Sequence, residues 1–347
     1  MNFILTLIIL IIVLGLIVFI HELGHFLAAK SIKAYIHEFA VGMGPTIFSF
    51  KRKNDETKYS LRLLPLGGYN AFAAPGEKGI KKDRILDNKK YSQRLFVLIM
   101  GIIFNFILAI ILLFINGLIF GSPITKPYIG DVVKNSASYN VGLREDDLII
   151  SINGKKVNSF DDVLLETRFS DDVKTYQFLI ERDEEEMLIT VVPTYEEDEE
   201  GNSRPVFGFA SSTKRENGII NAFKYAITAT YKNITSVFNI LGKLITGKIG
   251  MNNLSGPIGV FSVIDNIKSR GLESLIYLTA YLSINVGVIN LLPIPVFDGG
   301  KILLLLIERI KKDRLNPKIE TTFNMIGYIL LMILIIYVTF NDILNLF

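Results

Sequence analysis

Residues 18–30 read VFIHELGHFLAAK, an apolar helical pattern interrupted by two histidines and a glutamate. Residues 2–20 lead into this stretch without a charged residue and match the roughly 20 apolar residues that a membrane-spanning helix needs. They lack a basic leader and a small-residue cleavage site, so we expect a retained transmembrane helix over residues 1–30. Because ionisable side chains are costly inside a membrane, the histidines and the glutamate indicate a functional site.

Three further apolar runs follow along the chain. Of the 347 residues, 50% are hydrophobic, and long, sparsely charged runs fall at 94–120, 271–307 and 323–343. Each run is long enough to cross a membrane. The sequence therefore predicts an α-helical polytopic membrane protein with four transmembrane helices.

Charge is divided unevenly among the connecting segments. Residues 30–94 hold 14 Lys and Arg against 6 Asp and Glu, and residues 308–320 hold five against three. Residues 122–216 instead hold 11 against 20. Because short basic loops stay in the cytoplasm, we expect the first two segments on the cytoplasmic side. The acidic segment and both termini are then extracytoplasmic.

The cytoplasmic segment 31–93 contains a candidate β-hairpin. YSLRLLPLGGYNAFA, residues 59–73, alternates apolar and polar residues and then reaches Gly67-Gly68. This pattern predicts a short hairpin that turns at the two glycines. The hairpin is apolar enough to associate with the membrane. The neighbouring residues 37–50 are also rich in strand-forming residues and glycine.

The extracytoplasmic segment contains a compact β-rich domain, residues 126–195. Its order is a strand, a short helix in NSASYNVGL, a strand pair in DDLIISINGKKV with a turn at Asn153-Gly154, and a helix over 160–168. This order resembles a PDZ domain, which binds peptides by adding a strand to a sheet edge. The alternative is a generic β domain that acts as a spacer.

Two segments connect this domain to the third transmembrane helix. Residues 196–203 form an acidic turn or linker, and residues 218–270 have an amphipathic character. We expect helices lying on the external face of the membrane over 218–270. The alternative, a further span, is disfavoured by the lysines at 224, 232, 243 and 248.

His21 and His25 stand four residues apart, so on a helix they lie on one face, one turn apart. Glu22 follows the first histidine and completes the HExxH pattern of zinc metalloproteases, in which the carboxylate serves a metal-bound water. The alternative is a histidine pair that merely meets the lipid headgroups.

A zinc hydrolase usually has a third protein ligand. The chain has no cysteine, and its one other histidine, His37, lies in the segment after the helix. Asp298 is the better candidate, because it is the one acid between Glu273 and Glu308. It lies in NLLPIPVFDGG, residues 290–300, where prolines break the helix and broken backbone at membrane depth indicates a cavity.

HELGH in a first transmembrane helix, an external PDZ-like domain and NLLPIPVFDGG in a late helix resemble the site-2 protease family of zinc intramembrane proteases, closest to its bacterial regulator of sigma-E protease branch. The resemblance covers nearly the whole chain. It implies Zn²⁺ held by His21, His25 and Asp298, with Glu22 as general base. It also implies that Asn290 contacts the substrate or an oxyanion.

The resemblance extends to residues outside these motifs. Gly101 and Asn105 stand where such proteases have a glycine–asparagine pair near the site, and Asn105 becomes a candidate substrate contact. The hairpin at Gly67 and Gly68 is similar to a β element that holds substrate as a strand. For Asn105 and Asn290, hydrogen bonding between helices is the alternative. One PDZ-like domain is evident, whereas some relatives carry two.

The function expected from this resemblance is hydrolysis of peptide bonds within or near the transmembrane segments of single-span proteins, such as anti-sigma factors or remnant signal peptides. We expect residence in the lipid bilayer of the bacterial cytoplasmic membrane, a possible peptide ligand for the PDZ-like domain, and no nucleic-acid partner. Two other functions stay open: a membrane-anchored PDZ adaptor with a structural HExxH, and a zinc transporter or sensor. A transporter should show further intramembrane histidines or acids.

Overall fold

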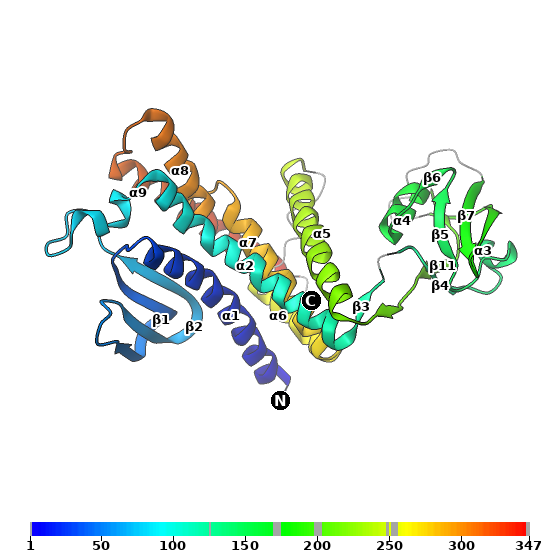
Figure 1. Cartoon of the computed structure of the whole chain (residues 1–347), viewed down its shortest axis with the longest axis horizontal. Helices are drawn as coiled ribbons and strands as arrows, with labels where there is room; N and C mark the ends of the chain where they lie inside the picture. Colours follow the sequence, from blue (N-terminus) through cyan, green and yellow to red (C-terminus); the bar gives the residue numbers. More distant parts are fainter. Residues whose placement is uncertain are drawn as a thin grey trace. The chain divides into compact units, whose positions relative to one another are not determined.

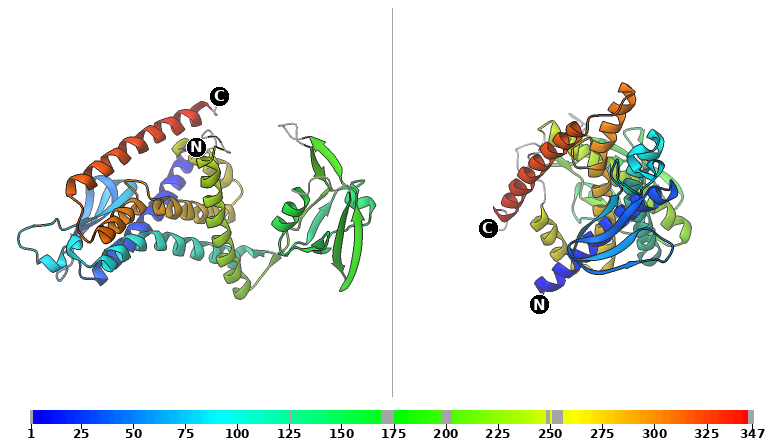
Figure 2. Two further views of the ribbon diagram at one scale, coloured as in Figure 1. Left: turned by 90° about the horizontal axis from the view of Figure 1, so that it is seen from above. Right: turned by 90° about the vertical axis from the view of Figure 1, so that its left-hand side faces the viewer.

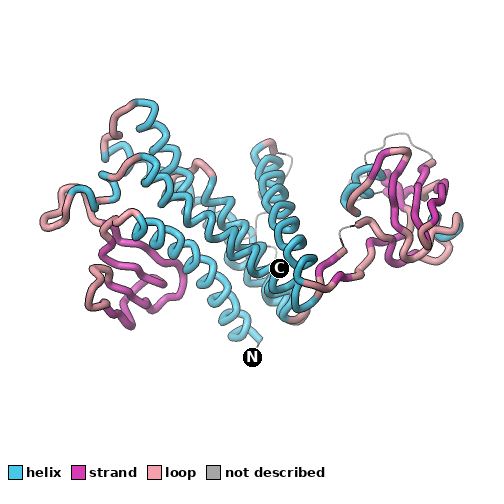
Figure 3. The backbone as a smooth tube through the Cα atoms, viewed as in Figure 1, coloured by secondary structure: helices cyan, strands magenta, loops and turns pink. Residues whose placement is uncertain are grey.

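A computed structural model describes residues 2–124, 126–168, 175–197, 203–247, 250 and 256–344, which lie in two compact units: residues 1–116 with 223–347, and residues 117–222. The first unit contains long helices and one strand pair, and the second is β-rich (Figures 1 and 3). The helices that begin in the first unit, with the strand pair, are α1 (Asn2–Ser31), β1 (Ile36–Lys51), β2 (Lys58–Phe72), α2 (Tyr91–Phe120), α6 (Pro257–Lys268), α7 (Leu272–Leu291), α8 (Asp298–Lys311) and α9 (Pro317–Leu344).

Among the described residues, four helices are long and apolar enough to cross a membrane, which confirms the predicted number of candidate spans. They comprise Phe3–Ser31, Tyr91–Phe120, Leu272–Leu291 and Lys318–Asp342. Helix α5 (Ile219–Ile245) and α6 lie in the predicted amphipathic segment and are not among these candidates. Residues 198–202 of the predicted acidic linker lie outside the described residues.

Helices α1, α2 and α7 pack around a common apolar core. Val13 and Ile17 of α1 meet Leu108 of α2, with Leu282 and Val286 of α7 against them. Further along, α2 and α7 run side by side (Figure 2), and together with α5 they bury a cluster of alanine, leucine, isoleucine and valine side chains. Dispersion contacts, interhelical hydrogen bonds and close backbone approach hold such helices together in a membrane.

A break in the third apolar run separates α7 from α8. Helix α7 ends at Leu291, and α8 begins at Asp298. Pro293 and Pro295 lie between them, and proline has no N–H to continue the helical hydrogen bonds. The predicted proline break is therefore confirmed, and residues 271–307 form two helices instead of one.

The predicted hairpin at 59–73 is wrong in its partner, because its two arms pair with β1, which lies before them in the chain, and not with each other. Residues 68–71 of β2 pair with residues 38–41 of β1 in the opposite direction. Residues 58–61 pair with the same residues of β1 in the same direction, so β2 reverses its direction between residues 61 and 68. Gly67 has a φ of +88°, a left-handed conformation that glycine adopts without strain. The glycines therefore lie at the end of this reversal, close to the position of the predicted turn.

A polar cluster ties this strand pair to the end of α1. Lys30 pairs with Asp55 at 2.5 Å, and the Tyr59 hydroxyl donates to the same carboxylate at 2.8 Å. Burial and this hydrogen bond raise the pKa of Tyr59 to about 12. The strand pair also exposes apolar side chains, among them Met43, Ile47 and Phe48.

Helix α6 is attached through polar side chains to both terminal spans. The Asp342 carboxylate of α9 accepts from the backbone N–H groups of Gly256 and Gly259, at the N-terminus of α6. At the other end of α6, the Thr6 hydroxyl of α1 donates to Asp265 at 2.6 Å. Asp342, the last residue of the fourth candidate span, thus has structural partners at the start of α6.

The second unit contains the elements predicted for residues 126–195, in the predicted order. A four-stranded sheet, β6-β5-β7-β8, encloses the core with α3 and α4, and Asn153-Gly154 has positive φ at both positions, as a tight hairpin turn requires. Its elements are β3 (Ser122–Pro123), β4 (Ile129–Val132), α3 (Ala137–Asn140), β5 (Leu148–Ile152), β6 (Lys155–Lys156), α4 (Phe160–Arg168), β7 (Tyr176–Arg182), β8 (Glu185–Val191), β9 (Thr194–Glu197), β10 (Ser203–Val206), β11 (Phe209–Ser211) and β12 (Arg215–Glu216). Whether the unit is a PDZ domain stays a prediction.

One buried ion pair links β7 to the start of β5. The Asp147 side chain is 1% exposed and accepts from Nε of Arg182 at 2.6 Å and from Nη2 at 2.7 Å. Removing one partner of a buried pair leaves an uncompensated charge. We therefore expect Arg182→Met to lower the free energy of unfolding of residues 117–222 by about 3 kcal/mol, measured by urea-dependent proteolysis of the full chain.

The matched control is Lys155→Met. Lys155 pairs with Glu166 at 2.9 Å, but its side chain is 70% exposed. Exposed pairs contribute less than about 1 kcal/mol, so this variant should unfold like the wild type. Equal effects of the two substitutions would contradict the assignment of the Asp147 pair as a structural link.

Candidate metal centre

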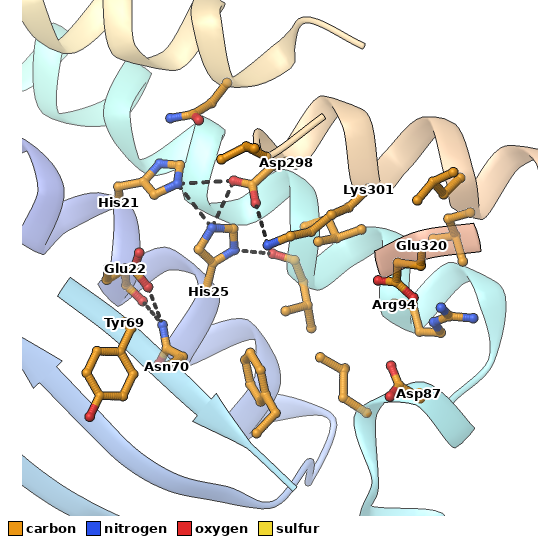
Figure 4. A pocket seen from close by; sticks show the side chains of 18 of the residues that line it. His21, Glu22, His25, Tyr69, Asn70, Asp87, Arg94, Asp298, Lys301 and Glu320 are labelled. Carbon is orange, nitrogen blue, oxygen red and sulfur yellow. Dashed lines mark hydrogen bonds and ion pairs between the residues drawn. The ribbon is translucent and has the colours of Figure 1, made fainter. Parts of the chain in front are cut away.

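Three donor atoms from two helices converge inside the first unit. Nε2 of His21 lies 3.1 Å from Nε2 of His25, and Oδ2 of Asp298 lies 3.1 Å and 3.0 Å from these two nitrogens. All three residues are buried, and Figure 4 shows their side chains pointing toward one another. The structure thus brings together the ligand set that the sequence predicted.

The triangle has the dimensions of a zinc site. Bonds of about 2.0–2.1 Å in a tetrahedral site put neighbouring donor atoms about 3.3 Å apart, close to the distances found here. Oδ2 of Asp298 is buried and has no hydrogen-bond partner among the described residues. Two imidazoles and one carboxylate are a donor set of catalytic zinc sites, in which water or substrate takes the fourth coordination position. His21, His25 and Asp298 therefore fit a zinc ion.

The chain approaches Asp298 through strained backbone. Val296 has a φ of +81°, a region that a β-branched residue enters at a cost of about 1–3 kcal/mol. Gly299 and Gly300 follow the aspartate, and a Cβ on either would lie within 2.3 Å of a backbone oxygen of residues 291–294. The strain and the two glycines let α8 begin directly against the end of α7.

Lys301 lies one turn after Asp298. Its Nζ is 3.7 Å from Oδ1, the carboxylate oxygen that faces away from the histidines. The two oxygens of Asp298 thus have different neighbours. Oδ2 faces the two imidazoles, and Oδ1 faces a cation.

Helix α2 contacts both histidines along one face. The Val97 carbonyl accepts a hydrogen bond from Nδ1 of His25 at 2.8 Å, and the Asn105 amide nitrogen lies 3.2 Å from Nδ1 of His21. Gly101 lies between these two residues, and a Cβ there would be 2.3 Å from Nε2 of His25. The spacing of four residues places all three on one face of the helix.

Glu22 is half-buried and is held by β2. The Asn70 amide donates to Oε2 of Glu22 at 2.7 Å and to its backbone oxygen at 3.0 Å. A Cβ on Gly68 would lie 3.1 Å from Cγ of Glu22, so a glycine lets the strand approach the helix here. Sequence reasoning missed Asn70 and Val97. One feature of the sequence could have pointed to Asn70, which directly follows Gly67-Gly68-Tyr69 in the predicted β element.

A cavity of about 490 Å³ opens beside these residues. Its wall includes the three candidate ligands, Glu22 and Asn290, with Lys301 and the charged residues Asp87, Arg94, Glu308 and Glu320. Among the other predicted contacts, Gly67, Gly68 and Asn105 do not line it. Asn105 is fully buried, and Gly67 faces Met43. His37 pairs with Glu77 at 3.0 Å and takes no part in the triangle.

The four candidate spans and the buried donor triangle fit a membrane protein with a metal centre, and comparison with known proteins identifies its family. Residues 9–334 match peptidase family M50. The chain is 32% identical to the regulator of sigma-W protease RasP of Bacillus subtilis, over 99% of this chain and 100% of that protein. It is 31% identical to the zinc metalloprotease RasP of Bacillus licheniformis, over 99% of each. The chain belongs to peptidase family M50 and is a zinc metalloprotease.

The contact between Gly101 and His25 generates a prediction. In Gly101→Ala, the added methyl group would overlap the His25 ring and push Nε2 away from the other two donors. We expect zinc affinity, measured by competition with a chelator, to fall at least about 10-fold. Gly242→Ala in α5 is the control, because a Cβ there meets nothing within 4 Å. Unchanged zinc binding by the Gly101 variant would contradict the geometry.

Proposed function

We propose that this enzyme hydrolyses peptide bonds within or next to the transmembrane segments of single-span membrane proteins, using zinc held by His21, His25 and Asp298 and Glu22 as the general base. The observation that carries the proposal is the donor triangle beside Glu22, on the helix that contains the first candidate span. A buried metal centre in such a helix suits a substrate that is itself in the membrane.

The chemistry is divided among a few side chains. Zinc, when bound, would lower the pKa of a bound water to about 7 and act as a Lewis acid that polarises the peptide carbonyl. Glu22 takes the proton of the attacking water at its carboxylate and returns it to the leaving amine. Asn290 lines the cavity and offers an amide donor to the developing oxyanion. Asn70 fixes the direction of the Glu22 carboxylate.

The substrate binds as an unwound strand, because the carbonyl groups of an intact helix are already hydrogen-bonded. The final part of β2 suits strand addition. Residues 68–72 pair with β1 on one side, and Tyr69, Asn70 and Phe72 also line the metal cavity. A peptide added to this edge would lie directly beside the three ligands. Gly67 and Gly68 act in this proposal by shaping the strand.

The setting follows from charge and from the relatives. We place the active site near the cytoplasmic side of the bacterial cytoplasmic membrane, with both termini and the β-rich unit outside and exposed apolar side chains of β1–β2 against the lipid. The Bacillus subtilis relative is named a regulator of sigma-W, which favours anti-sigma factors as substrates, with remnant signal peptides as a second group. The PDZ-like unit screens substrates that still carry a bulky external domain.

Glu22→Gln tests the general base. The amide keeps the size of the side chain and can still accept from Asn70. We expect zinc content to stay at that of the wild type and cleavage of a single-span substrate to fall about 10²- to 10⁴-fold. The measurement is single-turnover cleavage in detergent. A variant that cleaves like the wild type would leave the membrane-anchored adaptor or another base as the better explanation.

Asp298→Ala tests the third ligand. Loss of one of three protein donors should leave the purified protein with well below one zinc per chain, measured by mass spectrometry, and without cleavage. Asp313→Ala serves as the control, because this exposed aspartate lies later in the same stretch and outside the cavity. Full zinc content in the Asp298 variant would assign the third ligand elsewhere.

A further inference from the structure

We propose that Asn105 is a positioning residue for the metal centre: its side-chain oxygen accepts the Nδ1 proton of His21 and so keeps Nε2 of that ring available to zinc. The proposal rests on the ligand set proposed above and adds a residue that does not touch the metal. Its starting point is the burial of Asn105, which is fully enclosed between helices and faces His21.

The two nitrogens of His21 have separate surroundings. Nε2 lies in the donor triangle, 3.1 Å from both Nε2 of His25 and Oδ2 of Asp298, whereas Nδ1 faces Asn105. A neutral histidine that binds a metal through Nε2 carries its proton on Nδ1. That N–H is buried and needs an acceptor, since an unpaired buried donor costs about 1–3 kcal/mol.

Only one atom of the Asn105 side chain can be this acceptor. Nδ2 lies 3.2 Å from Nδ1 of His21, and Oδ1 is buried without a hydrogen-bond partner among the described residues. The two ends of a carboxamide have nearly the same shape, so a half turn about Cβ–Cγ exchanges them in place. Oδ1 has no other described bond to give up. Zinc on Nε2 therefore favours the orientation in which Oδ1 meets His21.

His25 already shows the same arrangement. Its Nδ1 donates to the Val97 carbonyl at 2.8 Å, which leaves its Nε2 as the coordinating atom. Val97 and Asn105 lie two turns apart on α2, as His21 and His25 lie one turn apart on α1. Ser283 of α7 donates to the Asn105 backbone oxygen at 2.8 Å and fixes this part of α2. One face of α2 thus supplies an acceptor to each imidazole.

Asn105→Leu and Asn105→Asp separate the acceptor role from packing. Leucine keeps the volume and offers no acceptor, whereas aspartate offers only acceptors. We expect the leucine variant to bind zinc about 10- to 100-fold more weakly, by chelator competition, and the aspartate variant to stay within about threefold of the wild type. Asn116→Leu is the matched control. Asn116 is 2% exposed on the same helix and donates to the Glu273 carbonyl at 2.8 Å.

Histidine-selective ¹⁵N NMR reads the ring protons directly, because the chain has 3 histidines and His37→Gln identifies the one outside the site. In the zinc-loaded wild type, we expect His21 and His25 both to carry the proton on Nδ1. In the leucine variant, the His21 ring signals should change at a zinc concentration about 10- to 100-fold higher than in the wild type.

Two results would overturn the proposal. One is wild-type zinc affinity in Asn105→Leu with an unchanged His21 spectrum, even if the KM for substrate rises, since Asn105 would then act on the substrate. The other is equal weakening by leucine and aspartate, since the amide nitrogen would then be the required atom. If the wild-type histidine signals do not respond to zinc at all, the proposed ligand set itself fails, and this result is distinct from both.

Discussion

The molecule depends on holding three polar donor atoms within about 3 Å of one another in a bundle of apolar helices. Each of these groups costs free energy away from water, and each is retained because a neighbour orients it. Nδ1 of His25 donates to the Val97 carbonyl, and Nδ1 of His21 lies against the Asn105 amide. Oδ1 of Asp298 faces the ammonium group of Lys301. The partners come from other helices or other turns, so the site exists only when the bundle is packed.

Close packing in turn depends on glycine. A Cβ on Gly24 would lie 2.4 Å from the Met100 backbone oxygen, and Gly101 leaves room for the His25 ring. These two glycines allow α1 and α2 to approach until a carbonyl and an amide of one helix reach the imidazoles of the other. Gly24 is the glycine of HELGH. Its position in that motif is explained by helix contact, apart from any role in catalysis.

Much of this could be predicted from local pattern. The apolar runs predicted four spans, the prolines predicted the break before Asp298, and the spacing of His21 and His25 placed both on one helix face. The strand pair could not be predicted in the same way. β2 pairs with residues 36–51, so the two arms on either side of Gly67 do not pair with each other as the local pattern suggested. Pairing between segments is a property of tertiary packing, whereas a glycine pair is a local signal.

The roles of asparagines were the hardest to infer, because an amide can bind substrate, metal-ligating residues or another helix with the same chemistry. Asn105, Asn70 and Asn290 all lie near the centre, yet they face His21, Glu22 and the cavity respectively. Only the packing of the helices and of β2 decides which atom each amide meets.

Of these three asparagines, Asn70 matters most for the proposed mechanism. It belongs to the strand segment that we assign to substrate binding, and it also holds the carboxylate that we assign as the base. A peptide added beside β2 would therefore act on the residue that positions Glu22. Asn70 would then take part both in binding the unwound substrate and in aligning the Glu22 carboxylate. Substrate binding would thereby be linked to the position of the general base. Such a link would favour strands over intact helices, since an intact helix has no free backbone groups to offer the edge of β2.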